Sequence, residues 1–127
     1  REKEKNLLMA SVRVAVRFRP NGGDNNIPSI VVFHPDKKTI QLEGIEPTGC
    51  GAATYTFDRS FSPSSTQADV FDELGQPVIE DVLKGYNGTI LAYGQTGAGK
   101  THTMFGAGNR PHLDSGLIPR SVQYLFR

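Results

Sequence analysis

Residues 94–101 read GQTGAGKT, and they follow a short apolar run, TILAY, at residues 89–93. The octapeptide fits the phosphate-binding pattern G-x-x-x-x-G-K-[ST], which lies between a β-strand and an α-helix in nucleotide-binding proteins. Gly94 and Gly99 permit a tight turn and a close approach of the backbone to phosphate. The N–H groups of such a loop and the positive end of the next helix then face the anion. We therefore expect a phosphate site here, with an ordinary glycine-rich turn as the alternative.

The end of the loop has the side chains that this chemistry needs. The Lys100 ammonium can reach the β- and γ-phosphates, and the Thr101 hydroxyl can ligate Mg²⁺. The sequence thus predicts a site for a nucleoside triphosphate with Mg²⁺ as its metal. The predicted phosphate-binding residues are Gly94, Gln95, Thr96, Gly97, Ala98, Gly99, Lys100 and Thr101.

The composition is that of a globular chain. With 127 residues, 37% of them hydrophobic and 21% charged, the chain is long enough for one domain and is unlike a disordered protein. It contains no apolar run near the ~20 residues that span a bilayer, so we expect no membrane span. Fourteen basic and thirteen acidic residues give a net charge of +1, which gives no reason to expect nucleic acid as a partner.

The single cysteine, Cys50, cannot form an internal disulfide, and this fits a reducing intracellular compartment. The chain begins Arg-Glu-Lys without an initiator Met, so we expect that residue 1 is not the natural start. Residues 1–10 are interpreted as a lead-in segment. Residues 11–127 are interpreted as part of one domain.

Strands are predicted in the first half of the chain. Residues 11–19 alternate valine and phenylalanine with arginine, as a half-exposed strand does. Two short runs, residues 30–34 and 39–43, flank a turn and predict a hairpin. Residues 54–57 predict one more brief strand.

A helix is predicted from about Gln67, capped by Ser64, Ser65 or Thr66. Gly75 and Pro77 should bend or divide this helix. Gly85 should end it. Its apolar residues recur at helical spacing and are expected to form one buried stripe: Val70, Phe71, Leu74, Val78, Val82 and Leu83.

The second half follows the order strand, loop, helix. Residues 89–93 predict a strand, and residues 100–105 predict a short helix after the loop. Residues 106–116 contain three glycines and a proline, so they interrupt helical spacing, which resumes over residues 117–127. This order is typical of an α/β fold with three layers and parallel strand pairing.

Four further stretches accompany the loop in a fixed order. They are RFRP at residues 17–20, YTFDRSF at 55–61, GYNGTILAY at 85–93, running directly into GQTGAGKTHTM, and GLIPR at 116–120. Together they resemble the N-terminal part of a kinesin motor domain, from about residue 11 onward. The resemblance implies a three-layer α-β-α P-loop NTPase fold, of which this chain holds a part, with ATP as the nucleotide.

The resemblance also implies a base pocket. It places Arg17, Arg19, Pro20 and His102 beside the adenine of ATP. Without it, the two arginines would be interpreted as a solvated strand face and His102 as a solvent-facing helix residue. Residues 105–116 would match a variable loop that is often tied to regulation of the nucleotide site. Residues 6–10 would match a segment that pairs with the neck linker, or they are a frayed end.

Two strings that kinesins use for hydrolysis, N-x-x-S-S-R-S-H and D-L-A-G-S-E, do not occur in these residues. Asp72 and Gly75 satisfy D-x-x-G, but they precede the loop within a predicted amphipathic helix, so we interpret them as structural. Phosphoryl transfer needs groups that position water and stabilise charge. We therefore expect no catalytic residue in this fragment, which alone should be inactive, with hydrolysis and tubulin binding carried by residues downstream.

The sequence is compatible with three functions. The first is the ATP-binding part of a kinesin-like, microtubule-based motor, located in the cytoplasm on the cytoskeleton. The second is a truncated nucleotide-binding or interaction module that does not hydrolyse ATP. The third is another P-loop enzyme, such as a GTPase, but no N-K-x-D string for guanine occurs. The motif context favours the first, and the sequence carries no signal for an oligomeric state.

Overall fold

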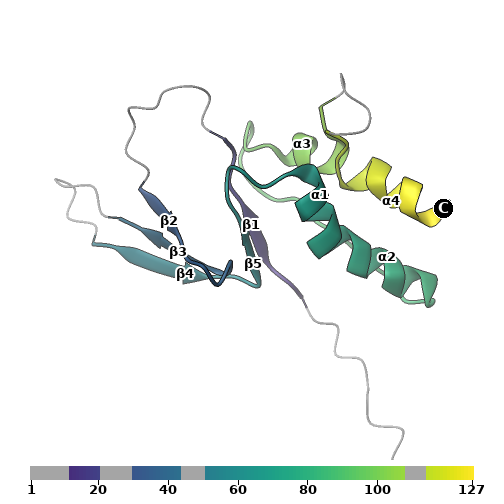
Figure 1. Ribbon diagram of the computed structural model, residues 1–127, viewed down its shortest axis with the longest axis horizontal. Helices are drawn as coiled ribbons and strands as arrows, with labels where there is room; N and C mark the ends of the chain where they lie inside the picture. Colours follow the sequence, from purple (N-terminus) through teal and green to yellow (C-terminus); the bar gives the residue numbers. More distant parts are fainter. Residues whose placement is uncertain (1–11, 21–29, 44–50, 108–113) are drawn as a thin grey trace, which may run out of the picture. The chain divides into compact units, whose positions relative to one another are not determined.

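A computed structural model describes residues 12–20, 30–43, 51–107 and 114–127 of the chain (Figure 1). The chain divides into two compact units, and each is described by itself. Among the described residues, the first unit comprises 12–18, 30–43 and 51–61, and it holds the strands. The second comprises 19–20, 62–107 and 114–127, and it holds the helices.

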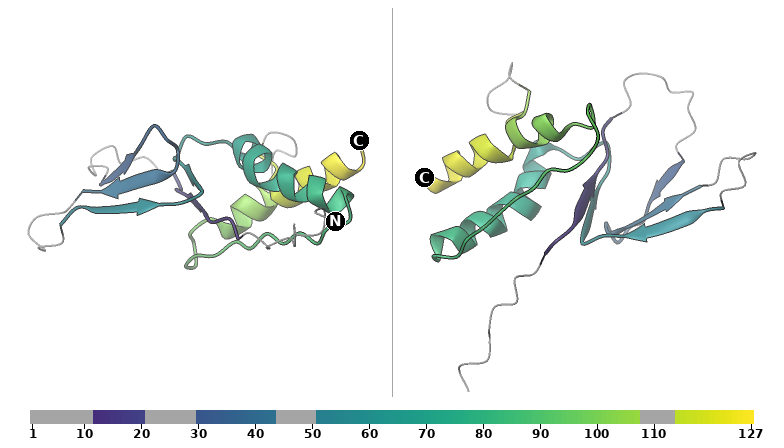
Figure 2. Two further views of the ribbon diagram at one scale, coloured as in Figure 1. Left: turned by 90° about the horizontal axis from the view of Figure 1, so that it is seen from below. Right: turned by 180° about the vertical axis from the view of Figure 1, so that it is seen from behind.

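The first unit consists of two small sheets. Strand β1 (Ala15–Arg17) pairs in parallel with β5 (Arg59–Phe61). Strands β2 (Val31–Phe33), β3 (Thr39–Leu42) and β4 (Ala53–Thr56) form an antiparallel sheet in that order (Figure 2). Ile40 and Phe61 are buried in this unit. The predicted hairpin and the strand near residue 54 are therefore confirmed.

The first strand is shorter than predicted, and β5 was not predicted at all. Alternation over residues 11–19 suggested nine strand residues, of which residue 11 lies outside the described residues. Pairing extends over Ala15–Arg17, because the partner β5 offers only three residues. The neighbouring residues still form bonds outside the ladder: Phe18 N–H donates to Phe61 O at 3.0 Å, and Val14 N–H donates to an Asp58 carboxylate oxygen at 2.7 Å.

The second unit begins with one long helical segment. It runs through α1 (Gln67–Val70), a π-helical turn η1 (Phe71–Gly75) and α2 (Gln76–Leu83). Thr66 caps the segment, because its hydroxyl accepts from Asp69 N–H while the Asp69 carboxylate accepts from Thr66 N–H. The predicted start is confirmed.

The predicted break at Gly75 and Pro77 takes the form of a π-turn. Proline has no N–H for the carbonyl four residues earlier, and its ring crowds that carbonyl in a regular α-helix. Here Gln76 N–H donates to Phe71 O, five residues back, so the helix widens just before Pro77 and continues. A π-turn is one of the known ways in which a helix continues past a residue that cannot make the regular hydrogen bond.

The expected buried stripe is only half buried. Val70 and Phe71 are buried, but Val82 is 39% exposed and Leu83 is 63% exposed. The π-turn adds a residue to one turn, so the apolar positions after it no longer follow the face set by those before it. The expectation of one continuous buried stripe was therefore wrong at its C-terminal end. Lys84 caps α2, and Gly85 follows with φ 94°, so the predicted helix end is confirmed.

The segment before the loop is not a paired strand. The structure assigns no strand to residues 86–93, so the strand predicted over residues 89–93 was wrong. Leu91 is 84% exposed and Tyr93 is 96% exposed, whereas Ile90 and Ala92 are half-buried. The alternation of an extended chain is present, but within the described residues no neighbouring strand pairs with it. Gly88 lies close to α2, since a Cβ there would be 2.5 Å from Val78 Cγ1.

Two further helices complete the unit, α3 (Lys100–Phe105) and α4 (Leu117–Leu125), both close to their predicted bounds. Helix α4 lies alongside α2, as both Figure 1 and Figure 2 show. Leu117 is buried and lies near Gly75, where a Cβ would be 3.1 Å from it. Gly75 of the D-x-x-G string thus provides room for helix packing. Among the described residues, no helix has the length and apolar character needed to cross a bilayer.

Candidate functional site

The loop at residues 94–99 is shaped by glycines in conformations that other residues avoid. Gly94, Gly97 and Gly99 have φ values of 153°, 82° and 100°. Residues with a Cβ rarely adopt positive φ, so these positions depend on glycine. Gly99 is the N-cap of α3, which means that the loop leads straight into the first turn of a helix.

Open space lies beside Gly97 and Gly99 of this loop. A Cβ built on Gly97 or Gly99 would meet no atom within 4 Å. Within the described residues, the N–H groups of Gly97 and Gly99 donate to no protein acceptor, whereas Ala98 N–H donates to Gln95 O at 3.2 Å. Unpaired backbone donors at the start of a helix form an arrangement that suits an anion.

The Lys100 side chain binds the backbone at the start of the loop. Its ammonium donates to Gly94 O at 2.7 Å and to Gln95 O at 2.8 Å. Both acceptors belong to the first residues of the loop, so the positive charge is held beside the start of the loop. An ammonium fixed there can meet a phosphate that binds to the loop.

Thr101 follows on the first turn of α3 and is exposed. No group of three or more His, Cys, Asp or Glu side chains is gathered in the described part of the chain in a way that could hold a metal ion. A hydroxyl contributes one oxygen, and Mg²⁺ usually completes its shell with water and nucleotide phosphate. The donor set around Thr101 therefore fits a metal that arrives with a nucleotide.

The structure connects part of the RFRP stretch to the loop. Arg19 Nη1 donates to Gly97 O at 2.9 Å, across 78 residues of sequence, and exposed Pro20 follows it. Arg17 is half-buried in β1 of the other unit, and burial lowers the pKa of its guanidinium. Of the predicted base pocket, Arg19, Pro20 and His102 thus share the unit of the loop, and Arg17 does not.

His102 lies on α3, and its partner was missed by sequence reasoning. The imidazole is exposed, and its Nδ1 is 3.3 Å from Nε2 of Gln67, a residue only 5% exposed. The same amide donates to His102 O at 2.7 Å. Gln67 was predicted only as the start of a helix. A glutamine at that place has no motif that indicates a contact 35 residues away.

The chain closes on itself where the helical spacing is interrupted. Gly106 and Ser115 form an antiparallel bridge. Ala107 N–H donates to Asp114 O at 3.2 Å, and Gly116 N–H donates to Phe105 O at 3.1 Å. We call these residues, 105–107 and 114–116, the neck. This name refers only to the pairing described here and has no connection with the neck linker. The interruption was predicted, but this pairing was not, and residues 108–113 lie outside the described residues.

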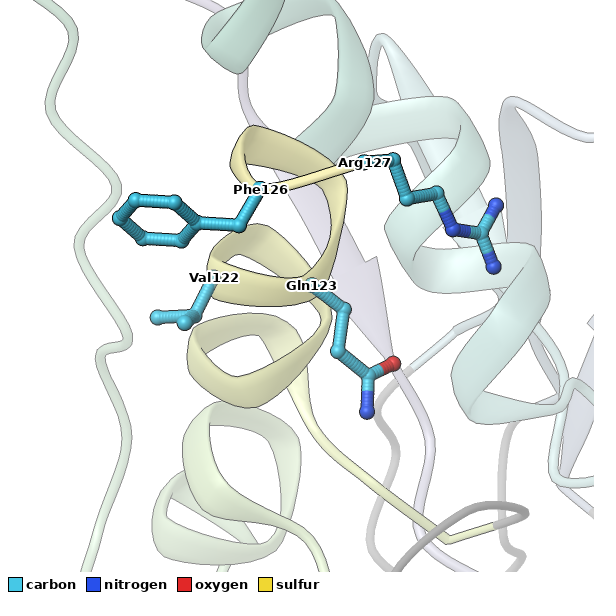
Figure 3. Close-up of a pocket in the computed structure, with 4 residues that line it drawn as sticks. All are labelled: Val122, Gln123, Phe126 and Arg127. Atoms are coloured by element: carbon cyan, nitrogen blue, oxygen red, sulfur yellow. The ribbon is translucent and has the colours of Figure 1, made fainter.

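A hollow at the end of α4 is a separate feature. It is lined by Val122, Gln123, Phe126 and Arg127, and Figure 3 shows Val122 and Phe126 projecting on the same side of the helix. Val122 is 50% exposed and Phe126 is 86% exposed. This apolar lining has one cation and no group suited to acid–base chemistry. The glycine loop is the stronger candidate site.

Comparisons with known proteins give a consistent result. The family model of the kinesin motor domain matches residues 17–127. Kinesin-related protein 3 of Dictyostelium discoideum is 41% identical over 93% of the chain, and human kinesin-1 heavy chain is 39% identical over 94%. The chain spans only 10% and 12% of the length of these relatives.

A solved structure agrees with the sequence relatives. It is described as that of a fast kinesin, with implications for ATPase mechanism and interactions with microtubules. Its TM-score is 0.79 at 39% identity, and the match covers 91% of this chain and 32% of the solved one. The fold class is therefore the α/β P-loop NTPase class that the sequence predicted, and the chain corresponds to about a third of that structure.

Proposed function

Because the chain belongs to the kinesin motor-domain family, we propose that it is the ATP-binding part of a microtubule-based, ATP-driven motor. In this proposal residues 94–101 bind the phosphates of ATP. The observation that carries the proposal is the loop itself. It combines positive-φ glycines, two N–H groups that have no acceptor within the described residues, and the Lys100 ammonium.

The phosphate end of the site follows from these contacts. The N–H groups of Gly97 and Gly99 would donate to phosphate oxygens. Lys100 would add charge-assisted bonds while keeping the loop carbonyls as partners. The Thr101 hydroxyl would be a ligand of Mg²⁺ bound with the nucleotide. That ion would neutralise charge on the β- and γ-phosphates.

In this proposal Arg19, Pro20 and His102 form the base end of the site. The bond from Arg19 to Gly97 O supports this assignment, because it joins one of these residues to the loop that would hold the phosphates. Arg17, which belongs to the first unit, is added only because the family resemblance implies it. The exposed imidazole of His102 is two residues after Lys100, on the same helix. Its ring is available for stacking on a purine.

Hydrolysis and tubulin binding are assigned to residues outside 1–127. Phosphoryl transfer needs a group that positions water and a further anchor for the metal. Neither hydrolysis string of the family occurs here. The solved fast kinesin is described with both an ATPase mechanism and microtubule interactions. We carry these properties over to the full-length protein, which we place in the cytoplasm on the cytoskeleton.

The test is Lys100→Ala in the full-length protein, with Lys84→Ala as the matched control. Lys84 is an exposed lysine that pairs with Asp81 at 3.0 Å on α2. We expect the affinity of the Lys100 variant for ATP to fall by at least about a hundredfold, because the charge-assisted hydrogen bonds from the ammonium to the β- and γ-phosphates are lost. Microtubule-stimulated ATPase should fall with it, while the control stays near wild type.

Near-normal ATPase in the Lys100 variant would refute the assigned role of this loop. If the wild-type protein binds ATP but microtubules do not stimulate its turnover, the second interpretation holds instead. In that case the protein is a nucleotide-binding module that does not act as a motor.

A further inference from the structure

Gln67 is a buried amide at the first position of α1, and it connects three parts of the second unit. Its Nε2 donates to His102 O at 2.7 Å and lies 3.3 Å from His102 Nδ1. It also lies 3.4 Å from Asp114 O. Buried side-chain amides are nearly always hydrogen-bonded. The NH₂ group of Gln67 faces acceptors on α3 and on the neck.

The partners fix the orientation of the amide. The two backbone carbonyl oxygens can only accept, so the NH₂ group of Gln67 faces them and not its Oε1. Nδ1 of His102 lies 3.3 Å from the same nitrogen and accepts from it in the tautomer that carries the imidazole proton on Nε2. Gln67 thus holds the His102 backbone through its carbonyl and favours that tautomer of the ring.

The same two carbonyls carry other bonds that define the neck. His102 O accepts from Gly106 N–H at 2.8 Å, at the end of α3. Asp114 O accepts from Ala107 N–H at 3.2 Å. One side chain thus holds the end of α3 and the returning strand of the neck at the same point.

We propose that Gln67 is a positioning residue for the base end of the nucleotide site and acts through His102. The proposal rests on the proposed function, in which His102 contacts adenine. The phosphate end does not depend on Gln67, because Lys100 is held by Gly94 O and Gln95 O. Loss of Gln67 should therefore weaken recognition of the base and leave recognition of the phosphates unchanged.

The experiment compares two ligands in the full-length protein, Mg·ATP and Mg·tripolyphosphate, by calorimetry. Gln67→Ala should raise the Kd for ATP about threefold to tenfold, the range for one or two lost hydrogen bonds. Its Kd for tripolyphosphate should stay within about twofold. Gln76→Ala is the matched control, because that amide donates to Glu80 at 2.8 Å on α2, and both affinities should be unchanged.

A double variant tests whether the effect passes through His102. In a His102→Ala background, Gln67→Ala should cause no further loss of ATP affinity. Equal weakening of ATP and tripolyphosphate would overturn the proposal, because it indicates a general structural role. Unchanged ATP affinity in Gln67→Ala would also overturn it. A wild-type protein that binds tripolyphosphate but not ATP would instead remove the proposed function, and the inference with it.

One measurement needs no stable Gln67 variant. Nitrogen-15 NMR of histidine-labelled wild-type protein, with His102→Gln to assign the signal, reports the tautomer directly. We expect a protonated Nε2 and an unprotonated Nδ1. A proton on Nδ1 would contradict the hydrogen bond from Gln67 and overturn the proposal.

Discussion

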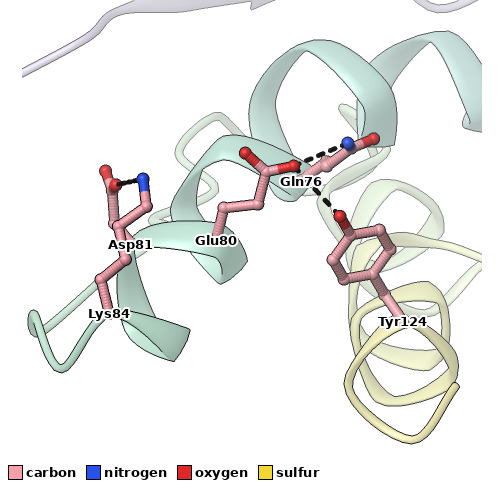
Figure 4. A network of polar contacts seen from close by, with 5 residues as sticks. All are labelled: Gln76, Glu80, Asp81, Lys84 and Tyr124. Carbon is pink, nitrogen blue, oxygen red and sulfur yellow. Dashed lines mark hydrogen bonds and ion pairs between the residues drawn. The ribbon is translucent and has the colours of Figure 1, made fainter.

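The Tyr124 hydroxyl donates a hydrogen bond of 3.0 Å to Glu80 Oε1, across 44 residues of sequence. The same carboxylate oxygen accepts from Gln76 Nε2 at 2.8 Å, and Figure 4 shows the three side chains meeting between α2 and α4. The Tyr124 ring also lies against Phe71, with 6.0 Å between centroids. These contacts hold α4 against the long helical segment. Buried Leu117 of α4 adds a further contact near Gly75.

The first prediction is that Tyr124→Phe loosens α4 while keeping its ring contact. The variant loses the bond to Glu80 and should lower the Tm by a few degrees. Hydrogen exchange at the α4 amides should become faster. Tyr93→Phe is the control, since Tyr93 is 96% exposed and its change should leave both quantities unaltered. Identical exchange at α4 in Tyr124→Phe and wild type would show that this bond does not hold the helix.

The second prediction concerns pH. Hydrogen bonds from Gln76 and then Tyr124 lower the pKa of Glu80 from 4.5, and the bond to Glu80 raises the pKa of Tyr124 from 10.0. A lowered carboxyl pKa gives stability that is present above 4.5 and lost as the pH falls through the folded value. A raised phenol pKa gives stability that is present below 10.0 and lost as the pH rises through the folded value. Lys84 and Asp81 also act on Glu80, with opposite signs.

The difference in stability between wild type and Tyr124→Phe should therefore be largest from about pH 5 to pH 9 and shrink on both sides. Denaturant unfolding at a series of pH values measures it. A difference that stays constant from pH 3 to pH 11 would rule out the charged Glu80 as the partner.

The sequence was most informative where local rules decide the structure. The loop from Gly94 to Thr101 and the hairpin turn near Asp36 depend on neighbouring residues, and both were predicted at their places. The cap at Thr66 was one of three adjacent candidates. The two short helices around the neck were also found, because glycines and a proline mark their ends.

The sequence was least informative where distant residues decide. The strand expected at residues 89–93 has the right alternation, but a strand also needs a neighbour, and alternation does not supply one. Burial of Val82 and Leu83 was lost through the π-turn, which is a response to Pro77 that helical spacing alone does not reveal. Gln67 was missed for the same reason, since nothing near it in sequence indicates His102.

The third prediction is that Asp36 titrates far below an ordinary aspartate. Its carboxylate accepts from Thr39 N–H and Lys38 N–H, both at 2.9 Å, and from the Thr39 hydroxyl at 2.7 Å. These bonds, led by the one from Thr39 N–H, lower the pKa of Asp36 from 3.8 to about 2. Carbon-13 NMR of the carboxyl group should show a midpoint near that value.

The stabilisation by Asp36 should be complete above about pH 4 and should fade as the pH falls toward 2. Asp36→Ala should lose the hairpin turn at neutral pH, where Lys37 has a φ of 56° and depends on the turn to hold it. A midpoint near 3.8 would mean that the three bonds do not persist in solution.

The fourth prediction compares two glycines that both have free space for a Cβ but differ in backbone conformation. A Cβ meets no atom within 4 Å at either Gly99 or Gly51, but only Gly99 has a positive φ, 100°. Gly99→Ala should cost about 1–2 kcal/mol of loop stability. Affinity for Mg·ATP should fall about fivefold to thirtyfold as the loop leaves its binding conformation. Gly51→Ala should bind like wild type, and equal effects of the two changes would show that backbone strain at the loop is unimportant.

The fifth prediction concerns the neck, where a Cβ has no room. Gly106 has a φ of 93°, and a Cβ there would overlap the backbone of Asp114 and lie 2.7 Å from Gly116 N. Gly106→Ala should therefore break the bridge to Ser115 and cost more than about 2 kcal/mol, since both strain and overlap must be relieved. Hydrogen exchange should rise at Ala107 and Gly116, whose N–H groups close the neck. Ala107→Gly keeps its N–H and should leave the exchange of Gly116 low. Slow exchange at both amides in Gly106→Ala would contradict this prediction, because it would show that the bridge to Ser115 persists with a side chain at residue 106.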